Sequence, residues 1–342
     1  MKNILLSSVA IVAFAGAAAA EVSFSGDVTL GYNNDVEDGF YADAGLDVAF
    51  SAELNNGWTA GGTVGADMDD LTNGTAITVN TDFTAYVESD MGGLYFGEYT
   101  SAVDQLVSSP EGLTDGMSDY DDDDIGDNGE QLVLKTKFGA VEAAVSAYVL
   151  STGKTDGTTV AVKGSFGTMN FSLGHDAGDA IVSADAATNL NVGTTFGGAD
   201  VTVGFASVGD DTNYGIEVGY PVGPVALSVW YATGDQASVM GLKGVYADGP
   251  VSVTAKAEKV EGADTTFNLE GTYDMGNGLM IGAGTVDGEG EYLAGKYDLG
   301  GGASFLASYA NATTPAGTDI GDAYDGTFEL KDGVTLAVSL SF

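Results

Sequence analysis

Hydrophobic residues alternate with polar or small residues along most of the chain. The pattern is clearest at the C-terminal end, where threonine, alanine and serine separate the apolar positions Val334, Leu336, Val338, Leu340 and Phe342. A period of two is typical of β-strands with one apolar face, and after residue 20 no stretch keeps the period of a helix. The pattern therefore predicts an all-β chain with strands of about 9 to 11 residues.

The turns between the predicted strands recur regularly and share a signature. Most have an aromatic residue one to three positions before a glycine, as in Phe138-Gly139, Phe166-Gly167 and Phe196-Gly197. One hairpin takes about 26 residues, so each strand with its connection takes about 13. Most of these aromatic residues have the parity of the apolar face. Such a ring at one rim is typical of the aromatic girdle of a membrane barrel.

The number of turns predicts the number of strands. Nine turns fall on the girdle side, near Asn55-Asn56-Gly57, Gly92, Gly139, Gly167, Gly197, Gly223, Gly249, Gly276 and Gly300. If both chain ends also lie on that side, the barrel has up to 20 strands. A soluble β-sandwich is the alternative, since it also alternates. The uniform hairpin period, the girdle and the absence of a composition break favour a transmembrane antiparallel β-barrel with an even strand number.

The first residues form a separate segment. Lys2 precedes an apolar run from Ile4 to Phe14, and Ala18-Ala19-Ala20 offers a cleavage site before Glu21. Residues 1–20 are therefore predicted to be a Sec-type signal peptide, and residues 21–342 the barrel. No later stretch approaches the length of a transmembrane helix.

The charge of the chain is strongly negative. Fifty acidic residues face ten basic ones, all lysine, which gives a formal net charge of −40. Phosphate backbones need cationic partners, so nucleic-acid binding is excluded. Because 44% of the residues are hydrophobic, the chain can still fold. It has no cysteine and cannot rely on disulfide bonds.

One connection breaks the regular period. The segment at about 101–129, between strands ending near Tyr99 and beginning near Gln131, is far longer than the others. Its acidic residues, with one at the start of the next strand, are Asp104, Glu111, Asp115, Asp119, Asp121, Asp122, Asp123, Asp124, Asp127 and Glu130. A long loop in a compact barrel is usually functional. The alternative is a solvated acidic surface loop.

Several of these features together resemble a known family. They are the start Glu21-Val-Ser-Phe-Ser-Gly-Asp27, the turn Asp298-Leu-Gly-Gly-Gly-Ala-Ser304, the terminal Phe342 and the acidic insertion. With them, the segment from Glu21 to Phe342 resembles the general porins of Rhodobacter and related alphaproteobacteria. The resemblance implies a trimeric, usually sixteen-stranded barrel in the lipid of a Gram-negative outer membrane. It also implies that the third extracellular loop, here the acidic one, folds into the lumen and narrows the pore.

Parity assigns the lysines to the lumen. Six lie opposite in parity to the apolar residues of their strands: Lys135, Lys137, Lys163, Lys243, Lys256 and Lys296. Charges avoid lipid in any barrel, which accounts for this direction. We expect Lys135, Lys137 and Lys163 to form a basic wall that faces the acidic loop across the constriction. The resembling porins carry arginines on early strands, but residues 21–134 contain no lysine or arginine. Because rings of carboxylates select cations, a cation-preferring channel is predicted.

The aspartate run in the loop also invites a metal interpretation. Oxygen ligands suit Ca²⁺, and the resembling porins hold calcium near this loop. Asp119, Asp121, Asp123 and Asp127 are therefore candidate ligands of a weak Ca²⁺ site. The EF-hand pattern fails, because Asp124 stands where that loop requires glycine. A solvated acidic run is the alternative, and no cofactor is required.

Enzyme chemistry finds little support in the sequence. A Ser-His-carboxylate site would need His175, the single histidine, to reach a serine such as Ser172 or Ser183. No phosphate loop, dinucleotide fingerprint or zinc spacing occurs. The sequence thus predicts a passive channel for small hydrophilic solutes. Two alternatives remain, a non-conducting structural or adhesive barrel and a substrate-specific channel. A substrate-specific channel would need aromatic residues along the lumen, and Tyr148 and Trp230, which have lumen parity, are too few to form such a track.

Overall fold

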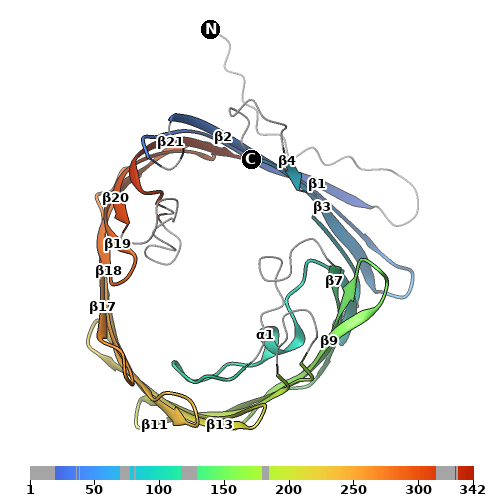
Figure 1. Ribbon diagram of the computed structural model, residues 1–342. Coiled ribbons are helices and arrows are strands. Elements are labelled where there is room, and N and C mark those ends of the chain that lie inside the picture. Colours follow the sequence, from blue (N-terminus) through green and yellow to red (C-terminus); the bar gives the residue numbers. More distant parts are fainter. Residues whose placement is uncertain are drawn as a thin grey trace.

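The chain folds into one sheet that closes on itself. The structure is a computed structural model that describes residues 20–35, 37, 39–69, 78–80, 82–116, 129–178, 185–312, 328 and 330–342. Neighbouring strands pair antiparallel, and the first strand also pairs with the last, so the sheet forms a ring (Figure 1). No helix in the described part of the chain is long and apolar enough to span a membrane.

The strands follow one another around the ring in chain order, with one short helix between two of them. The elements are β1 (Glu21–Asn33), β2 (Gly39–Glu53), β3 (Thr59–Asp69), β4 (Thr78–Asn80), β5 (Phe83–Ser89), β6 (Gly92–Gly97), α1 (Ala102–Leu106), β7 (Gly129–Phe138), β8 (Val141–Leu150), β9 (Thr155–Phe166), β10 (Met169–Asp176), β11 (Ala187–Phe196), β12 (Ala199–Val208), β13 (Asp211–Val222), β14 (Val225–Gly234), β15 (Val239–Asp248), β16 (Val251–Val260), β17 (Thr265–Asp274), β18 (Leu279–Val286), β19 (Gly290–Gly300), β20 (Ala303–Ala312) and β21 (Gly333–Ser341).

The described strands occupy 20 positions in the wall. β3 pairs with β4 through Asp67–Asp69 and with β5 through Thr59–Val64, so β4 and β5 share one position among the 21 strands of the sheet. The closed antiparallel barrel therefore has the even strand number that the turn count predicts. It is wider than the sixteen-stranded barrel that the family resemblance implies.

The alternation of the sequence becomes the two faces of this wall. On β14, Val229 and Tyr231 are exposed on the outer face, while Trp230 is only 2% exposed on the inner face. The predicted girdle is also present, because Phe138, Phe166 and Phe196 are 81%, 84% and 82% exposed at the rim with the short turns. An outward apolar face of this kind is suited to contact with lipid.

The short turns need glycine for a local reason. Gly139 and Gly223 have φ values of 62° and 61°, which residues with a β-carbon rarely adopt. Glycine at these positions lets adjacent strands reverse direction within two residues.

A charge on the outer face should destabilise the barrel far more than one on the inner face. Val64 on β3 faces outward, whereas its neighbour Thr63 faces inward. We expect Val64→Arg to cost about 2–4 kcal/mol, because arginine would enter the hydrocarbon layer. Thr63→Arg should cost much less, since the lumen can hydrate it.

Urea titration of the barrel folded into lipid vesicles gives both free energies of unfolding. Equal costs at the two positions would contradict the assignment of the faces.

Candidate functional site

The described part of the acidic insertion lies inside the ring, along the inner wall (Figure 1). The insertion begins with α1, whose cap is built by two residues. The Ser101 side chain accepts a hydrogen bond from the Asp104 amide, and the Asp104 carboxylate accepts one from the Ser101 amide at 3.0 Å. This reciprocal arrangement satisfies amides that the first turn of a helix leaves unpaired. Asp104 therefore has a structural role at the start of the loop.

The helix is amphipathic and packs against small side chains of the wall. Its buried residues Ala102, Val103 and Leu106 contact a patch formed by inward-facing residues of β7, β8 and β9. That patch consists of Val133, Ala144 and Ala161. Small side chains let the helix backbone approach the sheet closely, so α1 lies flat on the wall.

Hydrogen bonds hold the loop backbone to the wall beyond the helix. The Ala102 amide donates to the hydroxyls of Ser146 at 2.9 Å and Thr159 at 3.1 Å, both fully buried. Further along, the Asn213 side-chain amide donates to the Thr114 carbonyl at 3.1 Å. These bonds tie the loop to wall strands from β8 to β13.

Two glycines of the wall provide room for the loop. A β-carbon at Gly204 would lie 2.7 Å from both Leu113 and Pro110, and one at Gly215 would lie 3.2 Å from Leu113 and 3.3 Å from Pro110. The loop therefore rests directly on backbone at β12 and β13. Any larger residue at Gly204 would force the loop toward the lumen.

A lysine of the wall binds the described part of the loop. Lys256 on β16 forms ion pairs with Glu111 at 2.8 Å and with Glu258 at 3.4 Å. Its ammonium also lies 5.3 Å from the centre of the Trp230 ring, within the range of a cation–π contact. Lys256 was predicted to face the lumen, but its pairing with the loop was not predicted.

Of the other predicted loop acids, the structure describes Asp115 and Glu130. The Asp115 carboxylate accepts hydrogen bonds from the Ser109 hydroxyl at 2.6 Å and the Asn189 side-chain amide at 3.2 Å. Glu130 lies near the start of β7 and is partly buried. The remaining acids lie outside the described residues: Asp119, Asp121, Asp122, Asp123, Asp124 and Asp127.

The three lysines predicted to face the loop lie on the strands that α1 packs against. Lys137 and Lys163 bind the same carboxylate, that of Glu142, at 3.0 Å and 3.3 Å. Lys135 lies over the Tyr95 ring, 4.5 Å from its centre. Each of the three thus contacts a neighbour on the wall, whereas the lysine that forms an ion pair with a loop acid, Glu111, is Lys256. Their part in a constriction stays a prediction.

The early strands carry an acidic wall that the sequence reasoning missed. Asp27, Asp47, Asp67 and Asp82 stand on the inner face, at or next to β1, β2, β3 and β5 in turn. Gly45 separates two of them, because a β-carbon there would lie 2.7 Å from an Asp27 oxygen and 2.8 Å from an Asp67 oxygen. A parity reading of these strands, extended from lysines to acids, would have found this group, the acidic wall.

A second segment also packs inside the barrel. Phe328 and Leu330, from the last connection, are 1% and 0% exposed against inward-facing residues of β19 and β20. A β-carbon at Gly282 on β18 would lie 2.4 Å from the Phe328 ring, so glycine is needed there. Next to them, Lys331 binds Glu37 and lies 4.3 Å from the centre of the Tyr41 ring. The apolar residues Phe328 and Leu330, close together in a mostly polar connection, were the signal in the sequence.

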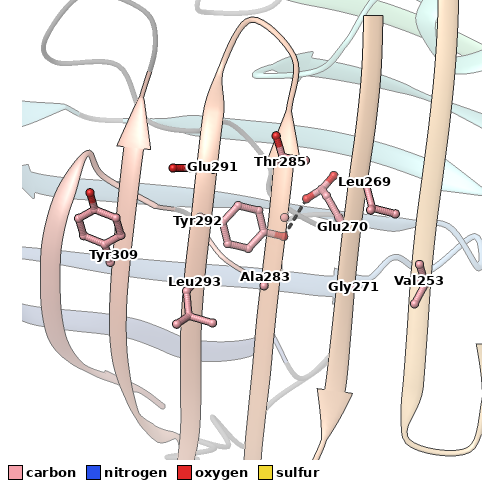
Figure 2. Close-up of a pocket in the computed structure, with 11 residues that line it drawn as sticks. Val253, Leu269, Glu270, Gly271, Ala283, Thr285, Glu291, Tyr292, Leu293 and Tyr309 are labelled. Atoms are coloured by element: carbon pink, nitrogen blue, oxygen red, sulfur yellow. Dashed lines mark hydrogen bonds between the residues drawn. The ribbon is translucent and has the colours of Figure 1, made fainter.

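One pocket opens on the outer face. Figure 2 shows it around Gly271 and Ala283, which are cross-strand partners on β17 and β18. These small residues leave a groove of about 630 Å³ between the outward side chains of Leu269, Leu293 and Tyr309. The Tyr292 hydroxyl, on the inner face, donates to Glu270 at 2.9 Å (Figure 2). The groove therefore lies outside the lumen of the barrel.

Within the described ranges, the candidate metal-binding and catalytic residues do not come together in a site. No cluster of three or more histidine or acidic side chains there could hold a metal ion. The candidate Ca²⁺ ligands Asp119, Asp121, Asp123 and Asp127 lie outside those ranges, so that site stays a prediction. His175 contacts the Thr188 hydroxyl at 2.9 Å on the outer face, whereas Ser172 faces inward. Ser183 lies outside the described residues.

Comparison with known proteins identifies relatives of this barrel. A family model described as Gram-negative porin matches residues 7–317. No curated protein matches the chain in sequence. Among solved structures, two engineered variants of the Rhodopseudomonas blastica porin are 13% and 14% identical in sequence. Each alignment covers 94% of this chain and 100% of that one, with a TM-score of 0.45.

Filling the space beneath the loop should displace the loop. Gly204→Val would push Leu113 and Pro110 away from the wall, so we expect a loss of about 1–3 kcal/mol in stability. The single-channel conductance should also fall, because the loop moves toward the pore axis. Gly219→Val is the matched control on the same face, since no atom lies closer than 3.9 Å to a β-carbon there.

Urea unfolding and planar-bilayer recordings give the two quantities. Equal conductance in both variants would contradict the position of the loop.

Proposed function

The chain belongs to the Gram-negative porin family and is thus a channel-forming barrel of the bacterial outer membrane, and we propose that it is a passive, cation-preferring channel for small hydrophilic solutes. Solutes would cross by diffusion through the lumen, and no bond would be made or broken. Selection would depend on the size left free by the loop and on the charge of the wall.

The observation that carries the cation preference is the acidic wall. Asp27, Asp47, Asp67 and Asp82 lie on adjacent inner positions, and residues 21–134 contain no lysine or arginine to neutralise them. Carboxylates that line a lumen raise the local concentration of cations and repel anions. The net charge of −40 adds to this field.

The loop would supply the size limit. Its contacts with Ser146, Thr159 and Asn213 support a fixed narrowing on one side of the lumen. We include in this constriction the predicted acids of the loop and the three wall lysines Lys135, Lys137 and Lys163. The homotrimer and the weak Ca²⁺ site also belong to the proposal; cross-linking of the native assembly and calcium titration would test them.

One observation favours a substrate-specific channel as a second candidate. Tyr86 and Tyr95 stack with ring centres 6.3 Å apart, and Tyr99 meets Tyr95 edge-on at 5.4 Å. Inward aromatic rings of this kind could bind the apolar face of a sugar. Tyr148 and Trp230 do not extend this group, because they are 3% and 2% exposed. Liposome swelling with sugars and non-sugar solutes of matched size would separate the two functions.

Removing the charges of the acidic wall should weaken the cation preference. We expect the quadruple variant Asp27→Asn, Asp47→Asn, Asp67→Asn and Asp82→Asn to lower the cation-to-anion permeability ratio at least about twofold. The measurement is the reversal potential in a planar bilayer under a KCl gradient.

A control variant loses the same number of charges outside the wall. Its sites are the turn residues Asp210, Asp235, Asp264 and Asp287. It should change the ratio much less. Anion preference of the unmodified channel, or equal shifts in both variants, would refute the role of the acidic wall.

A further inference from the structure

One line of cross-strand partners brings charged and polar side chains together below the loop. Lys137 pairs in register with Glu142, Glu142 with Lys163, Lys163 with Ser172, and Ser172 with Asn191. All five are on the inner face, on β7 to β11. Neighbouring strands are about 4.8 Å apart, so the polar groups from Glu142 to Ser172 lie within the reach of one small molecule and its first contacts.

A cavity lies along this line. It has a volume of about 350 Å³ and is lined by Glu142, Lys163, Ser172, Asn191 and, from the loop, Leu106 and Ser108. The volume is within the usual range for a small-molecule site. The loop covers one side and the wall forms the other, so a solute held here would lie beside the path through the pore.

Two buried groups in this cavity have unused hydrogen-bonding capacity. The Ser172 oxygen accepts from the Ser108 amide at 3.3 Å and from the Asn191 side-chain amide at 3.2 Å. Within the described chain, its own proton has no acceptor. Asn191 is 2% exposed, and its Oδ1 has no hydrogen-bond partner there. The Ser172 hydroxyl is therefore a donor left for a ligand, whereas the Asn191 Oδ1 lies against Gly204 on β12, 2.6 Å from the position of a β-carbon there, and is closed to one.

The ion pair of Lys163 and Glu142 offers a charged donor and a charged acceptor. Lys163 and Glu142 lie 3.3 Å apart and are both partly exposed to the lumen. Glu142 is also bound by Lys137 at 3.0 Å, so its charge remains compensated if Lys163 turns to a ligand. Lys163 can therefore release Glu142 and bind a solute without leaving the Glu142 carboxylate unpaired.

We propose that this cavity is a binding subsite for small zwitterionic solutes of the α-amino-acid type. The solute carboxylate would take Lys163 and the Ser172 hydroxyl, and the solute ammonium would take Glu142. The proposal rests on the channel function in that the solute reaches the cavity through the lumen and meets the charge of the acidic wall there.

The charge of the lumen supports a zwitterion over an anion. A carboxylate without an ammonium would be repelled by the acidic wall on its way in. A simple cation would be attracted to the wall but would meet Lys137 and Lys163 at the cavity. A zwitterion has no net charge and matches both members of the ion pair.

Three probes of similar size separate these cases. L-alanine carries both charges, L-lactate lacks the ammonium, and L-alaninamide lacks the carboxylate. Saturation-transfer NMR on the folded barrel in detergent, at neutral pH, measures binding without any need for conduction. We expect saturable binding of L-alanine, with L-lactate and L-alaninamide at least about tenfold weaker, because each loses a charge-assisted hydrogen bond.

Variants of the ion pair test the assignment of residues. Lys163→Gln and Glu142→Gln should each weaken L-alanine binding about tenfold or more. Lys296→Gln, an inward lysine on β19 away from the cavity, should leave it unchanged. Two ion-pair variants are used so that a folding defect in one does not decide the result, and urea unfolding checks both.

Any of three results would overturn the subsite. They are a failure of L-alanine to bind, equal binding of the three probes, and unchanged L-alanine binding in both ion-pair variants. Bilayer recordings keep this result apart from the channel function. A barrel that binds L-alanine but does not conduct would support the subsite and refute the channel, whereas a conducting barrel that binds none of the probes would refute only the subsite.

Discussion

Within a membrane, every backbone donor and acceptor must find its partner inside the protein. A single sheet meets this requirement only if it closes, and here β1 pairs with β2 on one side and with β21 on the other. Closure removes the free edges, and the strict alternation of each strand then decides what faces lipid and what faces water. The apolar parity turns outward, so the polar and charged parity must share the lumen.

The contents of the lumen follow from that division. A chain with a net charge of −40 has to place its acids in the lumen or in the connections, because the outer face cannot hold them. Glycines on the inner face provide the space: Gly45 lies between Asp27 and Asp67, and Gly204 lies beneath the loop. Where the wall carries small residues, α1 packs on it; where the wall carries aspartates, the lumen is left negatively charged.

Local patterns in the sequence predicted the features that depend on neighbouring residues. Strand faces, the girdle and the strand number follow from alternation and turn residues such as Phe138-Gly139. Long-range pairings were not predicted, since they depend on register and on where the loop lies. Glu111 and Lys256 are 145 positions apart in sequence, and the line from Lys137 to Asn191 appears only once five strands are aligned. Phe328 and Leu330 were missed because a connection has no periodicity to analyse.

The central claim is that alternation alone assigns each residue to lipid or to water. Since the chain has no cysteine, single cysteines can be placed at successive positions from 252 to 255 on β16 without a background signal. In lipid vesicles, a charged thiol reagent should reach Ser252 and Thr254, and brominated lipid should quench a fluorophore at Val253 and Ala255. Reaction of both sets with the aqueous reagent, or the opposite assignment, would contradict the account.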